Sequence, residues 1–211
     1  LSKTISLKEN GTGKPILQKL NPAWIALAEV VYRIEKQAYH MPVGRVIFQK
    51  IAYVATALGL PTGLTHVRSS YGPYCRELDE VKKRLSNAGL IQEQKEKSMF
   101  RVFPGLAYEK DKDKYKEDIS KWDNLIDKTV DLFLRLNTNQ AEIVATVLFV
   151  EKELNHKKGL TENDVLAEVM KWKQKRRPPL NDKEVAVAIR NLGVLKWFHL
   201  QPSSDLPVDQ F

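Results

Sequence analysis

The sequence predicts a mainly helical α+β fold with small β-hairpins, and three observations predict it. Apolar residues recur at helical spacing through most of the 211-residue chain. Short apolar, aromatic and β-branched runs between turn signals predict strands at 65–68, 90–94 and 99–103. Capping residues and glycines stand where the helical patterns start and end. We therefore expect helices to carry the core, with strands confined to hairpins.

The composition is that of an ordinary globular chain, with 43% hydrophobic and 28% charged residues. No apolar run approaches the roughly 18 residues that a membrane helix needs, and the start lacks a signal-peptide pattern. We therefore expect no membrane partner. The single cysteine, Cys75, fits a reducing cytoplasm and is typical of a small buried side chain. Because the chain starts with Leu1 rather than Met, we expect a fragment of a longer protein.

The formal net charge of +8 predicts acidic or polyanionic partners. Lys50 falls within a predicted core helix, where it must either reach solvent along its stem or pair with a buried acid. Most other basic residues are scattered along the chain, but one cluster consists of Lys171, Lys173, Lys175, Arg176 and Arg177. This cluster is either a solvated helix end or a binding patch, and the sequence leaves both interpretations open.

Two helices are predicted at the start of the first half. Asn21 is a typical N-cap and Pro22 fits a first helical position, which predicts a helix over 23–37. A second helix is predicted over 45–58, where apolar residues recur on one face. These residues are Ile47, Ile51, Val54 and Leu58. The run 59–63 contains two glycines and a proline, and we expect it to end this helix.

The next stretch predicts a sharp corner between the strand at 65–68 and a third helix over 75–87. The corner residues are Tyr71, Gly72, Pro73 and Tyr74. Gly72 allows an unusual backbone angle, and Pro73 fits the first turn of a helix. We therefore expect this corner to start the third helix.

A hairpin is predicted after the third helix. Gly89 is typical of a helix C-terminus, and the strands at 90–94 and 99–103 flank a charged turn at 95–98. Helices, a strand, a helix and then a hairpin is the order of a winged-helix module.

The second half predicts more helices and a repeat of this pattern. Helical spacing and capping signals predict helices that begin near residues 122, 141, 161 and 181. The Asn-Leu-Gly-Val-Leu sequence at 191–195 is similar to Asn-Ala-Gly-Leu-Ile at 87–91. This similarity predicts two tandem winged-helix-like units.

A run of both charge signs at 109–118 predicts a boundary, because it has little apolar surface to bury. The predicted organisation is a tail or linker (1–20), a first winged-helix-like unit (21–107), a charged linker (108–121), a second helical winged-helix-like unit (122–200) and a flexible tail (201–211).

Two sets of motifs follow one another in the chain. The first is F-Q-K-x-A-Y on a helix followed by Y-G-P-Y, at Phe48, Gln49, Lys50, Ala52, Tyr53, Tyr71, Gly72, Pro73 and Tyr74. The second consists of Ala145, Thr146, Val147, Val150, Trp172, Lys175 and Arg176, followed by a last helix. In this order, over about residues 20–200, they resemble the C-terminal domain of DarG, the antitoxin of the DarT/DarG toxin–antitoxin system. A more distant resemblance is to the Panacea antitoxin domain.

The resemblance implies an antitoxin domain that binds a DarT-like toxin, an ADP-ribosyltransferase that modifies single-stranded DNA. It implies inhibition by occupation of the toxin's DNA groove, and an N-terminal macrodomain whose glycine-rich loops this sequence lacks. Occupying such a groove requires flat groups where bases stack and acceptors where phosphates lie. The expected toxin-binding residues are Lys50, Arg68, Tyr71, Tyr74, Asp79, Glu80, Trp172, Lys175 and Arg176, with Gly72 and Pro73 as a structural corner.

The chain shows no pattern of residues that indicates catalysis. The four histidines, His40, His66, His156 and His199, are scattered and have no cysteine partners, so we expect no metal site. No nucleophile motif of the G-x-S-x-G kind occurs. We therefore expect a binding module without a cofactor rather than an enzyme.

Two further interpretations stay open. A winged-helix DNA-binding module or transcriptional autoregulator is supported by the net charge, the order of elements and the cluster at 171–177. Against it, the predicted helix at 75–87 carries acids nearly as often as bases, which disfavours contact with phosphates. The third interpretation is a structural scaffold segment.

Overall fold

The computed structural model describes residues 20–97 and 99–208, and over these residues the chain is mainly helical with two antiparallel hairpins. This confirms the mainly helical α+β class. None of the described helices combines the length and apolar character needed to cross a membrane. The longer helices are α1 (Pro22–Glu35), α2 (Arg45–Ala57), α3 (Leu78–Asn87), α6 (Asp123–Phe133), α7 (Thr138–Leu154), α8 (Glu162–Lys173) and α9 (Asp182–Val194). The remaining elements are β1 (Val67–Ser69), β2 (Gly72–Tyr74), β3 (Ile91–Glu96), β4 (Met99–Pro104), α4 (Leu106–Asp111), η1 (Lys112–Lys114), α5 (Lys116–Ile119) and η2 (Ser120–Trp122).

Helices α1 and α2 lie in the larger of two hydrophobic clusters. The Asn21 side chain accepts a hydrogen bond from the Ala23 amide at 2.9 Å, and Pro22 begins α1, as predicted. Helix α2 begins at Arg45, and every residue from Ile47 to Ala55 is buried. The helix therefore buries its polar face as well as its apolar face. This burial around the full circumference places polar residues of α2 inside the protein.

The predicted corner at 71–74 is a hairpin and does not start a helix. Ser69 pairs with Gly72 across a two-residue turn, and β2 pairs antiparallel with β1. The predicted strand at 65–68 is displaced to Val67–Ser69, and α3 begins only at Leu78. Gly72 has a φ of +87°, which agrees with the expected unusual backbone angle. Pro73 fits here because a strand of a two-stranded hairpin has one edge that needs no donor.

The second hairpin lies where the sequence predicts it, but β3 continues through Lys95 and Glu96, which the sequence predicts in the turn at 95–98. Gly89 follows α3 with a φ of +69°, and β3 pairs with β4 in a six-residue register from Ile91↔Pro104 to Glu96↔Met99. The backbone amide of Val102 donates to the Val43 carbonyl at 2.7 Å, which attaches the base of this hairpin to the segment before α2.

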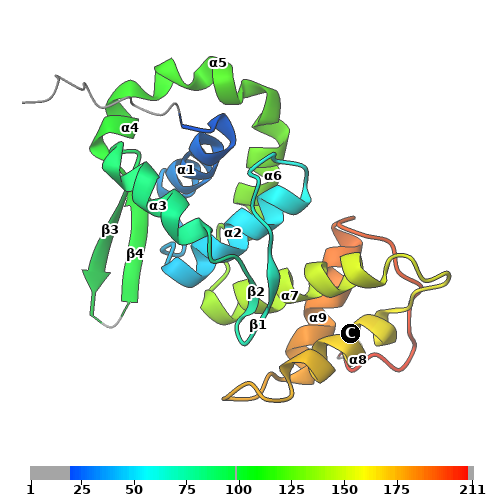
Figure 1. Cartoon of the computed structure of the whole chain (residues 1–211). Coiled ribbons are helices and arrows are strands. Elements are labelled where there is room, and N and C mark those ends of the chain that lie inside the picture. Colours follow the sequence, from blue (N-terminus) through cyan, green and yellow to red (C-terminus); the bar gives the residue numbers. More distant parts are fainter. Residues whose placement is uncertain (1–19, 98, 209–211) are drawn as a thin grey trace, which may run out of the picture.

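The predicted charged linker at 108–121 forms short helices that pack on the larger cluster. These helices and α6 arch around α1 (Figure 1). Tyr108 and Ile119 are buried, and the ring of Tyr108 stacks on Tyr115 with centroids 6.0 Å apart. The Tyr108 hydroxyl also donates to Glu29. The predicted linker therefore contains a few apolar residues that are buried against the larger cluster. Its overall polarity predicts a linker, but these residues make it part of the folded core.

The two hydrophobic clusters share α7, so the boundary expected within the linker at 108–121 does not separate them. Ile126, Val130 and Phe133 of α6 are buried in the first cluster. Helix α7 contributes Ala141 and Ala145 to the first cluster; its residues Ile143, Val144, Val147 and Val150 belong to the second, with α8 and α9. The change from one core to the other occurs across the faces of a single helix.

The second half lacks the wing that a tandem repeat requires. Among residues 122–208 no strand pair follows α9, and only an isolated bridge joins Thr161 to Gln201. The repeated glycines also differ, because Gly89 follows its helix whereas Gly193 lies within α9 and Lys196 takes the positive φ of 59°.

The expected flexible tail at 201–211 is packed in its described part. Leu206 is buried, Asp205 accepts a hydrogen bond from Asn163 at 2.6 Å, and Gln201 pairs with the residue before α8. The expected linker at 1–20 lies outside the described residues except for Leu20, as do residues 209–211.

Candidate functional site

A groove of about 750 Å³ lies beside the β1–β2 hairpin and brings together several of the predicted binding residues. Its walls come from α2, the hairpin, α3 and β3. We call it the hairpin groove, and its lining residues are Arg45, Val46, Gln49, Lys50, Ser69, Tyr71, Tyr74, Asp79, Lys82, Lys83, Ser86, Asn87 and Glu93.

Two polar side chains of α2 fix the hairpin backbone from below. Gln49 donates to the Cys75 carbonyl at 3.0 Å and accepts from the Cys75 amide at 3.1 Å. Lys50 is only 2% exposed, and its Nζ donates to the Pro73 carbonyl at 2.8 Å. Burial and, to a smaller extent, the nearby charge of Lys173 lower the pKa of Lys50 to about 8, while Glu142 acts in the opposite direction. These bonds hold β2 and its exit in one position.

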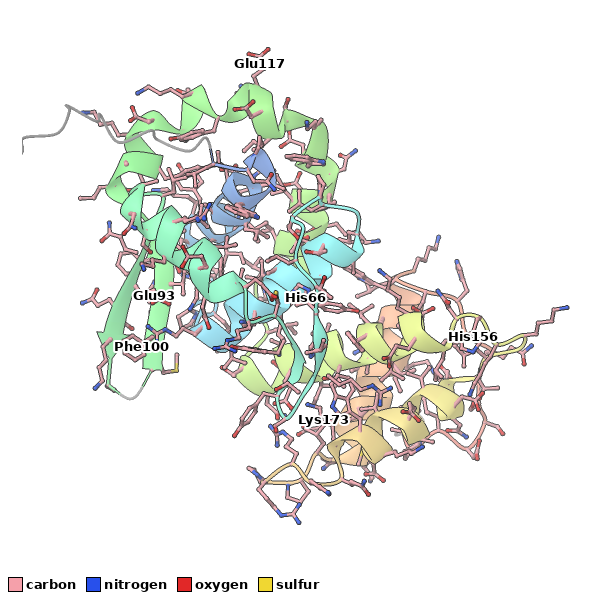
Figure 2. The ribbon with its side chains drawn as sticks, viewed as in Figure 1. His66, Glu93, Phe100, Glu117, His156 and Lys173 are labelled. Atoms are coloured by element: carbon pink, nitrogen blue, oxygen red, sulfur yellow. The ribbon has the colours of Figure 1, made fainter. Side chains whose placement is uncertain are left out.

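A buried charge cluster, formed by Lys50, Glu142, Lys173 and Arg176, lies under the turn of this hairpin. Glu142 of α7 is 1% exposed and accepts from Lys173 at 2.9 Å and from two nitrogens of Arg176 at 3.0 Å each. Lys173 also donates to the Ser70 carbonyl at 2.8 Å, and Figure 2 shows it beside the hairpin turn. Burial lowers the pKa of Lys173, although its bond to Glu142 acts in the opposite direction. The cluster thus joins α7 and α8 to a hairpin that follows α2.

Gly72 is required at the turn for two independent reasons. Its φ of +87° is strained for any side chain, and a Cβ atom there would lie 2.8 Å from the Thr146 hydroxyl. The hairpin therefore lies directly against α7. Next to Gly72, Tyr71 points outward and is 56% exposed.

The outer wall of the groove carries alternating charges that already have partners. The Tyr74 hydroxyl donates to Asp79 at 3.3 Å, and Lys82 pairs with Asp79 at 3.1 Å and with Glu93 at 3.3 Å. Arg45 binds both oxygens of Glu93. The charge of Asp79 raises the pKa of Tyr74.

The opposite side of the hairpin carries a second pair of predicted residues. Arg68 of β1 lies over the ring of Trp172 at 4.9 Å and pairs with Glu168 at 2.8 Å and with Glu153. Trp172 in turn contacts Phe149, with ring centroids 5.4 Å apart. Arg68 and Trp172 therefore attach β1 to the second cluster.

The structure thus separates the predicted site into three places. Lys50, Tyr71, Tyr74 and Asp79 line the hairpin groove, Arg68 and Trp172 lie across the hairpin, and Arg176 is in the buried cluster. Glu80 pairs with Arg84 along α3 at 3.4 Å and does not line the groove. Lys175 is exposed after α8 and does not line it either.

Sequence reasoning missed Glu142 and placed Lys173 in a surface cluster. Both residues had a signal. Glu142 is an isolated acid in the otherwise apolar run at 141–150, and Lys173 continues the face of Val165 and Val169 at spacings of four. A charge of each sign at core positions of two neighbouring helices indicates a buried pair.

The arrangement offers binding groups, and no group of histidine, cysteine or carboxylate side chains that could hold a metal occurs in residues 20–97 and 99–208. Cys75 is buried, and burial raises the pKa of its thiol, which makes it a poor nucleophile. What the groove presents is a fixed aromatic turn beside polar and charged walls. Comparison of the sequence with protein-family models and with curated proteins finds no match.

Proposed function

We propose that this chain is an antitoxin domain of the DarG type that binds and inhibits a DarT-like DNA ADP-ribosyltransferase. One observation carries the proposal: an exposed Tyr71 stands at the turn of a hairpin that Lys50 and Lys173 fix from beneath. An exposed large aromatic on a rigid support is the usual form of an energetic anchor in a protein interface.

The support matters as much as the aromatic ring. Binding costs free energy for each side chain and loop that must be ordered, and a preorganised loop avoids most of that cost. The hairpin turn is fixed by its bonds to Lys50 and Lys173 and by its contact with Thr146. Stability alone does not require an exposed tyrosine at this fixed turn.

We propose that the hairpin enters the single-stranded DNA groove of the toxin with Tyr71 and Tyr74 in the places of stacked bases. Phosphate imitation by Asp79 and Glu80 has less support, because Lys82 and Arg84 already neutralise these two carboxylates. The positive charges of Arg45, Lys82 and Lys83 along the hairpin groove also oppose a role as a phosphate mimic.

The test is co-expression with a DarT-like toxin, followed by a pull-down and an assay of single-stranded DNA ADP-ribosylation. The wild-type chain should form a complex and suppress modification. Tyr71→Ala should weaken the complex at least about tenfold, which corresponds to about 1.4 kcal/mol.

A matched control is Tyr39→Ala, because Tyr39 is 83% exposed and lies between α1 and α2, outside the hairpin groove. It should leave the complex and the inhibition unchanged. Equal binding by both variants would remove the hairpin turn from the interface, and a failure of the wild-type chain to form a complex would reject the antitoxin function.

A DNA-binding winged-helix module is the second candidate. Its support is the order of α1, α2, α3 and the β3–β4 hairpin, together with the net charge of +8. The exposed face of α3 carries Asp79 and Glu80 as well as Lys83 and Arg84, so it has no excess of positive charge. DNA retention that falls steeply with salt would favour this function, whereas a packed protein interface should be less sensitive.

A further inference from the structure

A second, smaller hollow of about 340 Å³ lies apart from the hairpin groove, between α2, α7 and the connection from α2 to β1. Its walls include Tyr53, Leu64, His66, Phe149 and Glu153. Figure 2 shows His66 near the middle of the molecule, where this connection passes the helices. We call this hollow the aromatic pocket.

Two residues that line this pocket each carry a buried polar atom with no hydrogen-bond partner in the described part of the chain. These atoms are the Tyr53 hydroxyl and the His66 Nε2. Tyr53 is only 5% exposed, so its hydroxyl cannot turn freely to bulk solvent. Leaving such a group unpaired costs about 1–3 kcal/mol. Two such atoms on residues that line one hollow call for a partner from outside the chain, a water molecule or a bound ligand.

The pocket environment keeps both groups uncharged near neutral pH. Burial lowers the pKa of His66 to about 4, with a smaller contribution from the charge of Lys50. Burial also raises the pKa of Tyr53 well above its usual range, and Glu151 and Glu153 add to this shift. Tyr53 then offers a hydroxyl donor, and the neutral imidazole of His66 offers one donor or one acceptor.

The remaining walls favour a flat ligand. The Tyr53 ring lies 5.3 Å from His66 and 5.5 Å from Phe149, centroid to centroid, so three rings surround the hollow. The exposed charges at its edge, Lys152 and Glu153, have opposite signs and favour neither an anion nor a cation. The volume lies at the small end of the roughly 300–1,000 Å³ that ligand pockets span.

We infer that the aromatic pocket binds a small, flat, uncharged molecule that presents a hydrogen-bond acceptor to Tyr53 and a polar edge to His66, such as an aromatic carboxamide or a nucleobase. This site is independent of the proposed antitoxin function, because the hairpin groove contains neither residue.

The test is a titration of the ¹⁵N-histidine-labelled chain with benzamide, uracil and benzoate, followed through the His66 ring signals. Benzamide or uracil should shift these signals and saturate, whereas benzoate, which has the same shape but a charge, should bind at least tenfold more weakly. Tyr53→Phe should weaken the neutral probes about tenfold, because it removes one hydrogen bond. Tyr39→Phe is the control and should bind like the wild type.

The unliganded variant gives a second readout. Because the hydroxyl has no partner within the chain, Tyr53→Phe should leave the midpoint of thermal unfolding unchanged or raise it. Benzamide should then raise the midpoint of the wild type more than that of the variant. Absence of saturable binding by both neutral probes at 10 mM, or equal binding to the wild type and Tyr53→Phe, would overturn the inference.

Discussion

The two hairpins in the described part of the chain differ in which residues hold them in place, and strand length does not predict this difference. Strands β1 and β2 have three residues each, whereas β3 and β4 have six. Isolated short hairpins are marginally stable in water, so the shorter one should be the weaker. Yet its turn is bonded to Lys173 of α8, its second strand to Lys50 of α2, and the residue after that strand to Gln49 of α2. Among the described residues, the longer hairpin is bonded only to the first half of the chain, through the Val102 amide and through the pairs of Glu93 with Arg45 and of Arg101 with Glu35, and its turn end is exposed.

The comparison shows that side chains from distant parts of the chain, and not the strand ladder, fix the shorter hairpin. Lys173 is 103 residues from Ser70, and the bond between them connects the second cluster to the first. Such a hairpin is stable only when both halves of the chain are folded. The position of the shorter hairpin therefore depends on both halves of the chain, whereas that of the longer hairpin depends on its own half.

The largest expected effect comes from removing the carboxylate under the shorter hairpin. Glu142→Gln leaves Lys173 buried at 1% side-chain exposure without its counter-charge. We expect a loss of about 3–5 kcal/mol in the free energy of unfolding, measured by urea denaturation. The control is Glu117→Gln on the exposed side of α5, which should change stability by less than about 0.5 kcal/mol. Similar losses for the two variants would show that the buried cluster does not fix the hairpin.

The next effect is a pH dependence that belongs to Lys50. Its pKa is about 8 in the folded chain and 10.5 in the unfolded chain. Between these values the unfolded chain holds a proton that the folded chain lacks, so the free energy of unfolding rises with pH. The full rise is on the order of 3 kcal/mol, and it disappears as the pH falls through 8.

Urea denaturation at pH 7.5, 9 and 10.5 measures this rise against Lys50→Met, which removes the titrating group. The wild type should gain stability relative to this variant over the range. Lys83→Met, at an exposed position of the same groove, should stay parallel to the wild type. Parallel curves for all three proteins would show that Lys50 is not buried as a charged group under the hairpin.

A smaller effect separates backbone strain from contact with α7. Gly63 and Gly72 both have positive φ, but a Cβ at Gly63 meets nothing within 4 Å, whereas one at Gly72 lies 2.8 Å from Thr146. Gly63→Ala should cost about 1 kcal/mol from strain alone, and Gly72→Ala about 1–2 kcal/mol more. Combining Gly72→Ala with Thr146→Ala should recover part of the difference in urea denaturation. Equal costs at the two glycines would mean that the hairpin does not press on α7.

The sequence predicts the local elements well because their signals are local. The Asn21 cap, the start of the second helix at Arg45 and the strands around Gly89 and Pro104 all follow from neighbouring residues. The corner at 71–74 was predicted as a helix start because Gly-Pro fits both a helix entry and a hairpin return. Only the bond from Lys50 to Pro73 and the contact of Thr146 with Gly72 distinguish the hairpin from a helix start, and both residues are distant from the corner in the sequence.

The candidate site was predictable in part for the same reason. Tyr71 and Gly72 can be singled out from a local motif, whereas the core positions of Glu142 and Lys173 suggest a buried pair only once their two helices are known to be neighbours. The mixed charge of 109–118 predicts a linker at 108–121, yet Tyr115 and Ile119, which are separated by polar residues, pack on the first cluster. Average polarity describes a segment, whereas burial is decided residue by residue.

The smallest expected effect concerns the turn of the longer hairpin. Lys97 has a φ of 54°, a conformation that costs an ordinary residue about 1–2 kcal/mol. Lys97→Gly removes that strain but adds flexibility to the unfolded chain, so we expect a net gain below about 1 kcal/mol in the free energy of unfolding. Lys95→Gly, two residues earlier within β3, is the matched control and should lose about 0.5–1 kcal/mol instead. A gain in the free energy of unfolding for Lys97→Gly and a loss for Lys95→Gly, both measured by urea denaturation, would show that backbone strain at Lys97 lowers the stability of this turn. The turn at Tyr71 differs, because side chains from other parts of the chain fix it. A loss for both variants would contradict that difference.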